Sequence, residues 1–251
     1  MKEMPEILAG RNAVREALVA GRRRVHKVML AEGMEEKGPV EQILRLCHET
    51  GISVQRVKRH ELDRLGGELQ HQGVAAQVSA YPYVDLPVVF ALARERQEAP
   101  FLLVLDSLQD PQNVGSLLRT AEAVGVQGVI LPERRAVGIT PAVSRASAGA
   151  VEHVLVSVVT NLAHTLDQLK KEGVWVVGVE NHPHARDYRQ VDLDIPLALV
   201  MGGEGSGLRR LVAEKCDLLL HIPMRGRIGS LNVSVAGSIV LYQAWNARRD
   251  G

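Results

Sequence analysis

The chain has 251 residues, of which 46% are hydrophobic and 24% are charged. This is the composition of a globular protein with one large domain or two smaller ones. A net charge of +1 excludes a global basic field as the means of holding a nucleic acid. No apolar run approaches the roughly 18 residues of a membrane-spanning helix, and residues 1–6 do not resemble a signal peptide. The distant Cys47 and Cys216 indicate reduced thiols in a cytoplasmic protein.

The basic residues are gathered in five clusters along the chain. The clusters are Arg22–Arg24 with Lys27, Arg56 with Lys58 and Arg59, Arg134 with Arg135, Arg209 with Arg210, and Arg225 with Arg227. One such cluster is typical of an ordinary solvated face. Five of them make RNA binding a hypothesis to test against the motifs, while solvated faces stay the alternative.

Residues 1–80 predict a small α/β domain in which helices pack on a sheet. The expected helices are 12–20, 39–49 and 61–65, and the expected strands are 25–30, 52–57 and 74–78. Gly21 and Gly51 follow the first two helices, as is typical of helix ends. Pro82 and Pro87 then break the pattern, so we expect a linker over 81–98 that includes a short helix at 88–96. The alternative is a loop within one domain.

Residues 99–251 predict a doubly wound α/β domain with a mostly parallel sheet of six strands. The expected strands are 101–105, 128–131, 154–158, 174–179, 197–201 and 218–222. The expected helices are 114–124, 141–149, 162–171, 208–214 and 236–247. The uninterrupted apolar run at 101–105 is typical of a parallel strand that is buried on both faces.

The first segment that carries chemistry follows the strand at 101–105 and opens a helix. Asn113 lies near the helix start, where its side chain is expected to cap free N–H groups. Arg119 comes six residues later, in a run that is otherwise apolar or small, so its guanidinium needs a partner or a crevice. The alternative is that Asn113 only caps the helix and that Arg119 only reaches solvent.

The second segment is a glycine-rich loop, Gly202–Gly207, which follows a buried strand. Gly203, Gly205 and Gly207 do not have the G-x-G-x-x-G spacing of a dinucleotide site, and the loop follows a late strand. A nucleotide-dependent oxidoreductase is therefore excluded. No Gly-Lys-Ser/Thr follows, and Glu204 would repel phosphate. Its carboxylate suits an amine, a hydroxyl or an arginine such as Arg119. The alternative is a tight turn with a solvated glutamate.

The third segment runs from His221 to Ala236. A short strand stops at Pro223, a basic loop with two glycines follows, and three polar residues then alternate with apolar ones. The polar residues are Ser230, Asn232 and Ser234. Backbone groups in such a loop and helix start are suited to holding a ligand, although an ordinary strand-to-helix turn has the same pattern.

Together, the three segments resemble the ordered signature of the SpoU/TrmH family of RNA ribose 2′-O-methyltransferases, part of the SPOUT superfamily. The resemblance covers nearly the whole chain. It is carried by Asn113 with Arg119, by Gly202–Gly207 and by Ile222–Ala236. Gly10–Leu18 and His71–Gly73 resemble the ribosomal-protein-like RNA-binding domain of the subgroup that methylates a guanosine of 23S ribosomal RNA.

Arg225 and Arg227 depart from this resemblance, since many family members have smaller or uncharged residues there. RNA contacts and solvated loop charges both stay open for these two side chains.

The resemblance implies S-adenosylmethionine as co-substrate, no metal, a C-terminal trefoil knot, and a homodimer formed through the C-terminal domain. It implies no membrane partner. The residues implied to bind the co-substrate are Met201, Gly202, Gly203, Gly207, Ile222, Met224, Leu231 and Ser234. His182 and His184 are expected to be loop residues rather than metal ligands.

The catalytic residues implied by the resemblance are Asn113, Arg119, Glu204, Ser230 and Asn232. Arg119 corresponds to the family's catalytic arginine. A guanidinium with a pKa above about 12 is a poor base. We therefore expect it to clamp the adjacent phosphate and to polarise the 2′-hydroxyl. A transfer RNA methyltransferase and a non-catalytic, ribosome-associated RNA-binding module are the alternatives, and the module has no need of the glycine loop.

Overall fold

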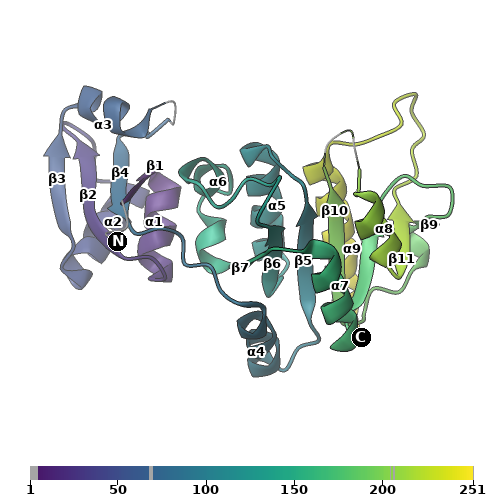
Figure 1. Ribbon diagram of the computed structural model, residues 1–251. Coiled ribbons are helices and arrows are strands. Elements are labelled where there is room, and N and C mark those ends of the chain that lie inside the picture. The colour runs from purple at the N-terminus through teal and green to yellow at the C-terminus, as the bar shows by residue number, and fades with distance from the viewer. Residues whose placement is uncertain (1–4, 68–69, 204, 206, 251) are drawn as a thin grey trace. The chain divides into compact units, whose positions relative to one another are not determined.

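The computed structural model describes residues 5–67, 70–203, 205 and 207–250, which form two compact units. Unit 1 comprises the chain up to Pro82 together with Ile139–His153, and unit 2 comprises Tyr83–Gly138 and the chain from Val154 onward. Figure 1 labels the elements of both units. The two units thus divide the chain differently from the expected domains, because a segment from the middle of the chain belongs to unit 1.

Unit 1 contains a four-stranded sheet in the order β1-β4-β2-β3. Its strands are β1 (Glu6–Ala9), β2 (Val25–Ala31), β3 (Ser53–Val57) and β4 (Val74–Val78). β2 and β3 are parallel, and β4 is antiparallel to both β1 and β2. The carboxyl ends of β1, β2 and β3 therefore lie at one edge of the sheet, beside the start of β4. The sequence predicted β2, β3 and β4 but missed β1, which has only four residues.

Helices cover both faces of the sheet of unit 1. They are α1 (Arg11–Ala20), α2 (Pro39–Thr50), α3 (Arg59–Gly66), α6 (Pro141–Ala146) and the 3-10 helix η1 (Ala150–His153). Val14 of α1 and Ile43 of α2 are fully buried against one face, and Leu62 of α3 is fully buried against the other. The predicted three helices are confirmed, and both Gly21 and Gly51 end their helices with a left-handed backbone.

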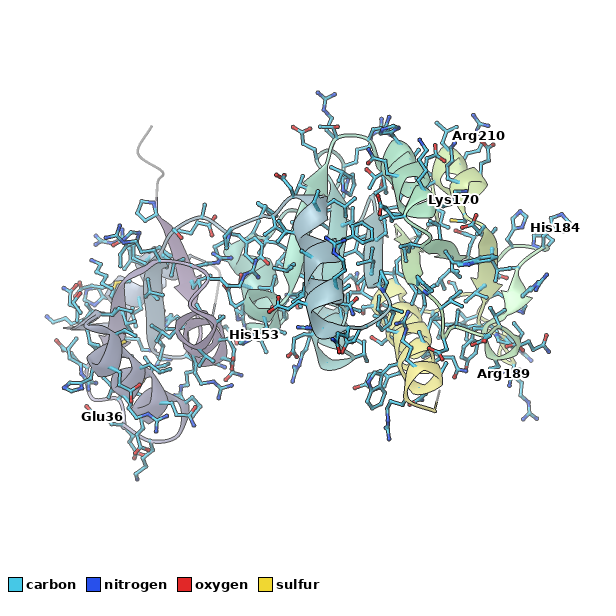
Figure 2. All side chains as sticks on the ribbon, turned by 90° about the horizontal axis from the view of Figure 1, so that it is seen from below. Glu36, His153, Lys170, His184, Arg189 and Arg210 are labelled. Carbon is cyan, nitrogen blue, oxygen red and sulfur yellow. The ribbon has the colours of Figure 1, made fainter. Side chains whose placement is uncertain are left out.

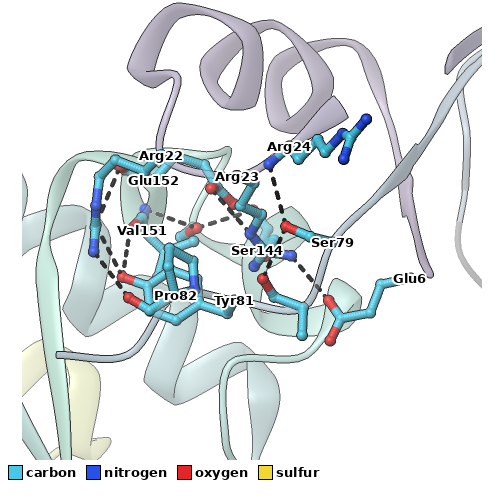
Figure 3. Close-up of polar contacts among 12 residues, drawn as sticks. Glu6, Arg22, Arg23, Arg24, Ser79, Tyr81, Pro82, Ser144, Val151 and Glu152 are labelled. Atoms are coloured by element: carbon cyan, nitrogen blue, oxygen red, sulfur yellow. Dashed lines mark hydrogen bonds and ion pairs between the residues drawn. The ribbon is translucent and has the colours of Figure 1, made fainter. Parts of the chain in front are cut away.

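A buried polar cluster attaches Ile139–His153 to the rest of unit 1 (Figure 3). The side chain of Arg23 is 0% exposed, and its Nε lies 3.1 Å from Oε2 of Glu152. The hydroxyl of Tyr81 donates to the carbonyl of Val151 at 3.1 Å, and the Arg23 guanidinium lies 5.0 Å from the centre of the Tyr81 ring. This segment therefore shares its polar core with unit 1.

Unit 2 contains a seven-stranded sheet in the order β7-β6-β5-β10-β8-β11-β9, in which every neighbouring pair is parallel. The strands are β5 (Phe101–Asp106), β6 (Gly128–Pro132), β7 (Leu155–Val159), β8 (Trp175–Val179), β9 (Arg186–Asp187), β10 (Leu197–Gly202) and β11 (Leu218–His221). All six predicted strands are present. The predicted number is wrong by one, because the two-residue edge strand β9 is too short to have a hydrophobic pattern.

Helices also cover both faces of this sheet. They are α4 (Leu86–Arg96), α5 (Pro111–Ala123), α7 (Leu162–Lys171), the 3-10 helix η2 (Tyr188–Gln190), α8 (Arg210–Lys215) and α9 (Val233–Asp250). Val89 of α4, Leu166 of α7 and Val212 of α8 share one buried cluster, so α4 packs on unit 2 although its sequence was expected in a linker. On the other face α9 packs against α5 and β10.

Gly237 permits the close approach of α9. A Cβ at this position would lie 2.5 Å from Cδ2 of Leu117 in α5 and 3.3 Å from Cε of Met201 in β10. Since helices lie on both faces of a parallel sheet, the predicted doubly wound α/β class is confirmed.

The carboxyl ends of β5, β8, β10 and β11 lie side by side at one edge of the sheet. Asp106 pairs in register with Gly202, and Val179 pairs with both Met201 and Leu220. Ligands of open parallel sheets bind at this edge. Within the parts of the chain that the structure describes, no helix combines the length and apolarity needed to cross a membrane.

Candidate active site

A cavity of about 470 Å³ opens where β8, β10 and β11 end. The predicted residues that line it are Met201, Gly202, Gly203, Gly207, Ile222, Met224, Ser230, Leu231 and Asn232. The lining residues that were not predicted individually but lie within the predicted segments are Gly205, His221, Gly229, Val233 and Ala236. The lining residues that the sequence analysis missed altogether are Val179, Glu180, Asn181 and Leu220. Such a volume is typical of sites for small molecules.

The glycine loop after β10 folds back on itself as one wall of the cavity. The N–H of Gly203 donates to the carbonyl of Gly207 at 3.1 Å, and the reverse bond measures 3.0 Å. A Cβ on Gly202 would lie 2.2 Å from the carbonyl carbon of Gly207. Gly207 has a φ of +62°, which favours glycine. The loop therefore needs glycine at both positions. Glu204, predicted as catalytic, lies outside the described residues.

Two carboxylates hold the chain as it leaves this loop. Asp106, fully buried at the end of β5, accepts from the backbone N–H of Arg209 at 2.9 Å and pairs with its Nε at 2.6 Å. Glu180, directly after β8, accepts from the N–H of Leu208 at 2.7 Å. Charge-assisted bonds of this kind are the stronger ones. Glu180 was missed, although its place at a strand's carboxyl end was the signal.

Asn232 joins the third segment to the first. Its Oδ1 accepts from the backbone N–H of Ser234 at 2.9 Å and of Val235 at 3.3 Å at the start of α9. Its Nδ2 donates to Oδ1 of Asn113 at 2.9 Å. One amide side chain therefore stabilises the start of α9 and also fixes α9 to α5.

Asn113 does not cap α5, contrary to the prediction. The cap is Asp110, whose carboxylate accepts from the backbone N–H groups of Gln112 and Asn113, both at 3.1 Å. The amide of Asn113 donates to the same carboxylate at 2.7 Å. The buried side chain of Asn113 is thus fixed by hydrogen bonds to Asp110 on one side and to Asn232 on the other.

Ser234 does not line the cavity, although the resemblance implies that it binds the co-substrate. Its hydroxyl donates to Oδ1 of Asn232 at 2.6 Å. Ser234 thus bonds to a lining residue, Asn232, and does not reach the cavity itself.

The loop from Ile222 to Leu231 forms the opposite wall of the cavity. Met224 and Leu231 line the cavity and are 39% and 37% exposed, so this wall includes apolar residues that are only partly covered by the protein. The Nδ2 of Asn181 donates to the carbonyl of Gly229 at 3.2 Å and holds this loop to the end of β8. Arg225 and Arg227 are exposed and do not line the cavity.

Arg119 lies on the exposed side of α5 and does not line the cavity. Among the described residues, no side chain forms a hydrogen bond or an ion pair with it. The structure therefore does not bring Arg119 to the cavity wall and leaves its side chain exposed.

His182 and His184 lie on the loop between β8 and β9, with ring centres 5.4 Å apart, and Figure 2 shows His184 at the surface. In the described part of the chain, no group of three histidine, cysteine, aspartate or glutamate side chains could hold a metal ion. Besides backbone groups, the cavity lining offers amides, a hydroxyl, thioethers, the carboxylate of Glu180 and the imidazole of His221. A lining with few charged groups, one of them a carboxylate, suits a neutral or cationic organic molecule.

The chain matches two family models that together cover most of its length. Residues 100–242 match the SpoU rRNA Methylase family, and residues 7–84 match the model "RNA 2′-O ribose methyltransferase substrate binding". Over 248 residues the chain is 46% identical to the putative TrmH family tRNA/rRNA methyltransferase YacO of Bacillus subtilis, covering 99% of this chain and 98% of that protein.

Solved structures have the same fold. The AdoMet-bound rRNA methyltransferase of Sinorhizobium meliloti is 27% identical, with a TM-score of 0.77 over 98% of this chain and 88% of that one. The SpoU methyltransferase AviRb of Streptomyces viridochromogenes, with AdoMet, has a TM-score of 0.80 over 99% of this chain and 92% of that one. At 22% identity, this similarity shows a shared fold and no more.

These matches define an RNA methyltransferase with an N-terminal substrate-binding domain. The chain belongs to the SpoU/TrmH family, and its co-substrate is S-adenosylmethionine.

Proposed function

We propose that this protein methylates the 2′-hydroxyl of a ribose in RNA and that the cavity at the ends of β8, β10 and β11 holds the methyl donor. The observation that carries the proposal is the joining of all three predicted segments at one edge of the sheet. The glycine loop and the loop from Ile222 to Leu231 line the cavity, and Asn232 bonds to Asn113 of the first segment.

The described residues fit S-adenosylmethionine. Backbone groups of Met201, Gly202, Gly203 and Gly207 would hold its adenosine, while the side chains of Ile222, Met224 and Leu231 would cover the ring. Ser234 would act through Asn232, which it bonds. S-adenosylmethionine supplies an electrophilic methyl group on a sulfonium, so the protein needs only to align the acceptor oxygen and to let its proton leave. Alignment alone can contribute roughly 7–11 kcal/mol.

Arg119 is proposed to clamp the phosphate next to the target ribose and to polarise the 2′-hydroxyl. With the donor bound, transfer would form the bond between the oxygen and the methyl carbon and break the bond between that carbon and sulfur. S-adenosylhomocysteine would leave with the electron pair on sulfur, and the hydroxyl proton would pass to water. Ser230, Asn232 and Asn113, together with Glu204, would orient the ribose. A planar, permanently charged guanidinium suits this task better than an amine.

A trefoil knot of the C-terminal segment and a homodimer formed through unit 2 are part of the proposal. Val235 and Tyr242 on α9 are 47% and 45% exposed, and Tyr242 meets Trp245 edge-on at 5.8 Å. Apolar side chains on an exposed helix face support a subunit interface. We place the activity in the cytoplasm, in line with the two reduced thiols.

The proposed target is a guanosine of 23S ribosomal RNA, with residues 1–80 as the RNA-binding domain and 99–251 as the methyltransferase domain. The resemblance of Gly10–Leu18 and His71–Gly73 supports this target. A transfer RNA is the second candidate, because the name of the Bacillus subtilis relative includes both kinds of RNA.

Mapping of 2′-O-methyl groups in RNA from a strain that lacks the gene tests both the reaction and the target. We expect one ribose of 23S ribosomal RNA to lose its methyl group and the intact gene to restore it. Loss at a transfer RNA position instead would replace the target and keep the reaction. Unchanged ribose methylation in every RNA would refute the reaction.

Calorimetry with S-adenosylmethionine separates the enzyme from a non-catalytic RNA-binding module. The enzyme binds the co-substrate in the absence of RNA, whereas a module without catalysis does not.

A further inference from the structure

Unit 1 has a cavity of its own, of about 640 Å³, at the carboxyl-end edge of its sheet. It is lined by Arg11 after β1, by the turn Glu32–Met34 after β2, and by Arg59, the first residue of α3 after β3. Gln72, just before β4, lines it as well. Ligands of α/β sheets bind where co-directed strands end, and β1, β2 and β3 all end here.

We propose that this cavity binds an unpaired nucleotide of the RNA, away from the ribose that is methylated. The inference rests on the proposed function, since it names how the RNA is held by unit 1. Residues 7–84 match a model for substrate binding, and that match does not identify which surface of the unit contacts RNA.

The turn at Gln72 and Gly73, which forms one wall of the cavity, has a left-handed backbone that other residues stabilise. Gln72 and Gly73 have φ values of +52° and +80°. The buried His71 secures them, because its Nδ1 accepts from the N–H of Gly73 at 2.9 Å. Its Nε2 then carries the proton and donates to Oδ1 of Asp63 at 2.8 Å. Strained backbone of this kind gathers at ligand sites.

Two further contacts fix the wall. Arg11 donates from Nε to the carbonyl of Gln72 at 3.2 Å, so its guanidinium is anchored while its outer nitrogens stay accessible. A Cβ on Gly73 would lie 1.8 Å from Cε of Met34, so the thioether of Met34 packs directly on the turn. Met34 thus offers a fixed, partly exposed apolar surface at the cavity.

The charges around the cavity match both parts of a nucleotide. Arg11 and Arg59 are exposed and suit a phosphate. Lys37 pairs with Glu35 at 3.4 Å. Glu32 adds a carboxylate, which repels a phosphate but accepts from the N–H groups of a base. Unpaired RNA bases are recognised in this way, by hydrogen bonds at their edges and by packing on their faces.

A double variant, Arg11→Ala with Arg59→Ala, tests the phosphate contacts in the intact protein. The substrate is unmodified total RNA from a strain that lacks the gene, with labelled S-adenosylmethionine. We expect the KM for RNA to rise at least tenfold, and kcat and the co-substrate Kd to stay within about twofold. The matched control is Arg45→Ala with Arg64→Ala, which removes the same charge from unit 1. Arg45 lies within α2 and Arg64 near the end of α3; both are exposed, and neither lines the cavity.

An unchanged KM in the cavity variant, or an equal rise in the control, would overturn the proposal and leave the proposed function intact. If the wild-type protein methylates no RNA, the proposed function fails by itself. Ultraviolet cross-linking of the wild-type protein to the same RNA then tests the cavity independently. Nucleotide adducts on the peptides with Met34 or Gln72 support it, and adducts only elsewhere refute it.

Competition with unlabelled RNA tests whether the nucleotide must be unpaired. We expect a single-stranded 16-mer to reduce cross-linking at Met34 at a concentration at which a fully paired 16-mer duplex does not. Equal competition by the duplex would overturn the assignment to an unpaired nucleotide.

Discussion

The Nδ2 of Asn232 donates to Oδ1 of Asn113 at 2.9 Å, across 119 positions of the chain. The same Asn232 side chain uses its Oδ1 for the first N–H groups of α9. The two atoms of one amide therefore have separate tasks, and substitutions can separate them.

Asn232→Asp should keep the cap and lose the bond to Asn113. A carboxylate still accepts from Ser234 and Val235, but the buried Oδ1 of Asn113 loses its donor, so the free energy of unfolding should fall by about 1–3 kcal/mol. The carboxylate cannot donate to Asn113, so we expect kcat to fall by about 10²-fold, which corresponds to roughly 2.7 kcal/mol. Asn232→Ala should lose the cap as well and destabilise the protein by about a further 1 kcal/mol. Initial rates and chemical denaturation measure the two effects.

The matched control for Asn232 is Asn161, which caps α7 by accepting from the N–H of His164 at 3.1 Å. Asn161→Ala should cost about 1 kcal/mol of stability as well, with normal turnover. Normal turnover of Asn232→Asp would contradict the orienting role of the bond to Asn113.

Arg119→Lys should lower kcat by about 10²–10³-fold while the Kd of S-adenosylmethionine stays the same. Lysine keeps the charge but lacks the planar fork that grips a phosphate. Since Arg119 is exposed and does not line the cavity, the substitution should not disturb the fold. Arg94→Lys on α4, also exposed, is the control with normal kcat. Turnover of Arg119→Lys at the normal rate would exclude the arginine-specific role.

Gly202→Ala should abolish binding of S-adenosylmethionine. The added Cβ would lie 2.2 Å from the carbonyl carbon of Gly207 and would open the loop. Gly226→Ala in the following basic loop is the control, because a Cβ there meets no heavy atom within 4 Å. Calorimetry should show no heat for the first variant and the wild-type affinity for the second. Wild-type affinity in both would mean that the loop does not form the donor site.

The strands around the cavity could be predicted because each is a short and mostly apolar run. Their boundaries followed from apolar pattern and glycine, whereas Gly202, Ile222 and Leu231 were assigned to the co-substrate through the family resemblance. Glu180 and Asp106 escaped notice, because a carboxylate at the end of a strand is only a weak signal until the fold shows which N–H groups it faces. β9 escaped notice because two residues have no periodicity.

The membership of Ile139–His153 in unit 1 could not be predicted from the sequence. Its partners Arg23 and Tyr81 are far away in the chain, and Glu152 is a charged residue that pattern analysis places at the surface. Only the tertiary structure brings these groups together in a buried cluster. The placement of Arg119 outside the cavity could not be predicted either. Helical spacing shows which face of α5 a residue occupies, but it does not show which part of the protein packs against that face.

Both thiols should be unreactive in the folded protein. Burial raises the pKa of Cys47 to about 11 and that of Cys216 to about 12. At pH 8 the thiolate is the reactive form and is scarce at both positions, so iodoacetamide should label them at least about 10²-fold more slowly than free cysteine. Labelling in denaturant should be fast and serves as the control. Rapid labelling of the native protein would show that these segments open.

Arg23→Met should loosen Ile139–His153 in a pH-dependent manner. Burial raises the pKa of Glu152, and Arg23 opposes that rise. The pKa of Glu152 in the folded protein lies above its unfolded value of 4.5. The contribution of Glu152 to the free energy of unfolding therefore falls as pH rises from about 4.5 through the folded pKa. Without Arg23 the buried carboxylate is unpaired, and the cost should reach about 3–5 kcal/mol at pH 8 and be smaller at pH 5. Amide hydrogen exchange of residues 139–153, corrected for the intrinsic pH dependence of exchange, measures the loss of local stability at each pH.

Two further variants isolate the Glu152 charge as the cause. Arg23→Met with Glu152→Gln should regain much of the lost protection at pH 8, because an amide is cheaper to bury than a carboxylate. Arg45→Met should leave protection unchanged, because its i,i+4 pair with Glu49 is exposed and contributes little. Equal loss for Arg23→Met at both pH values would show that the guanidinium acts by packing over Tyr81 rather than by its charge.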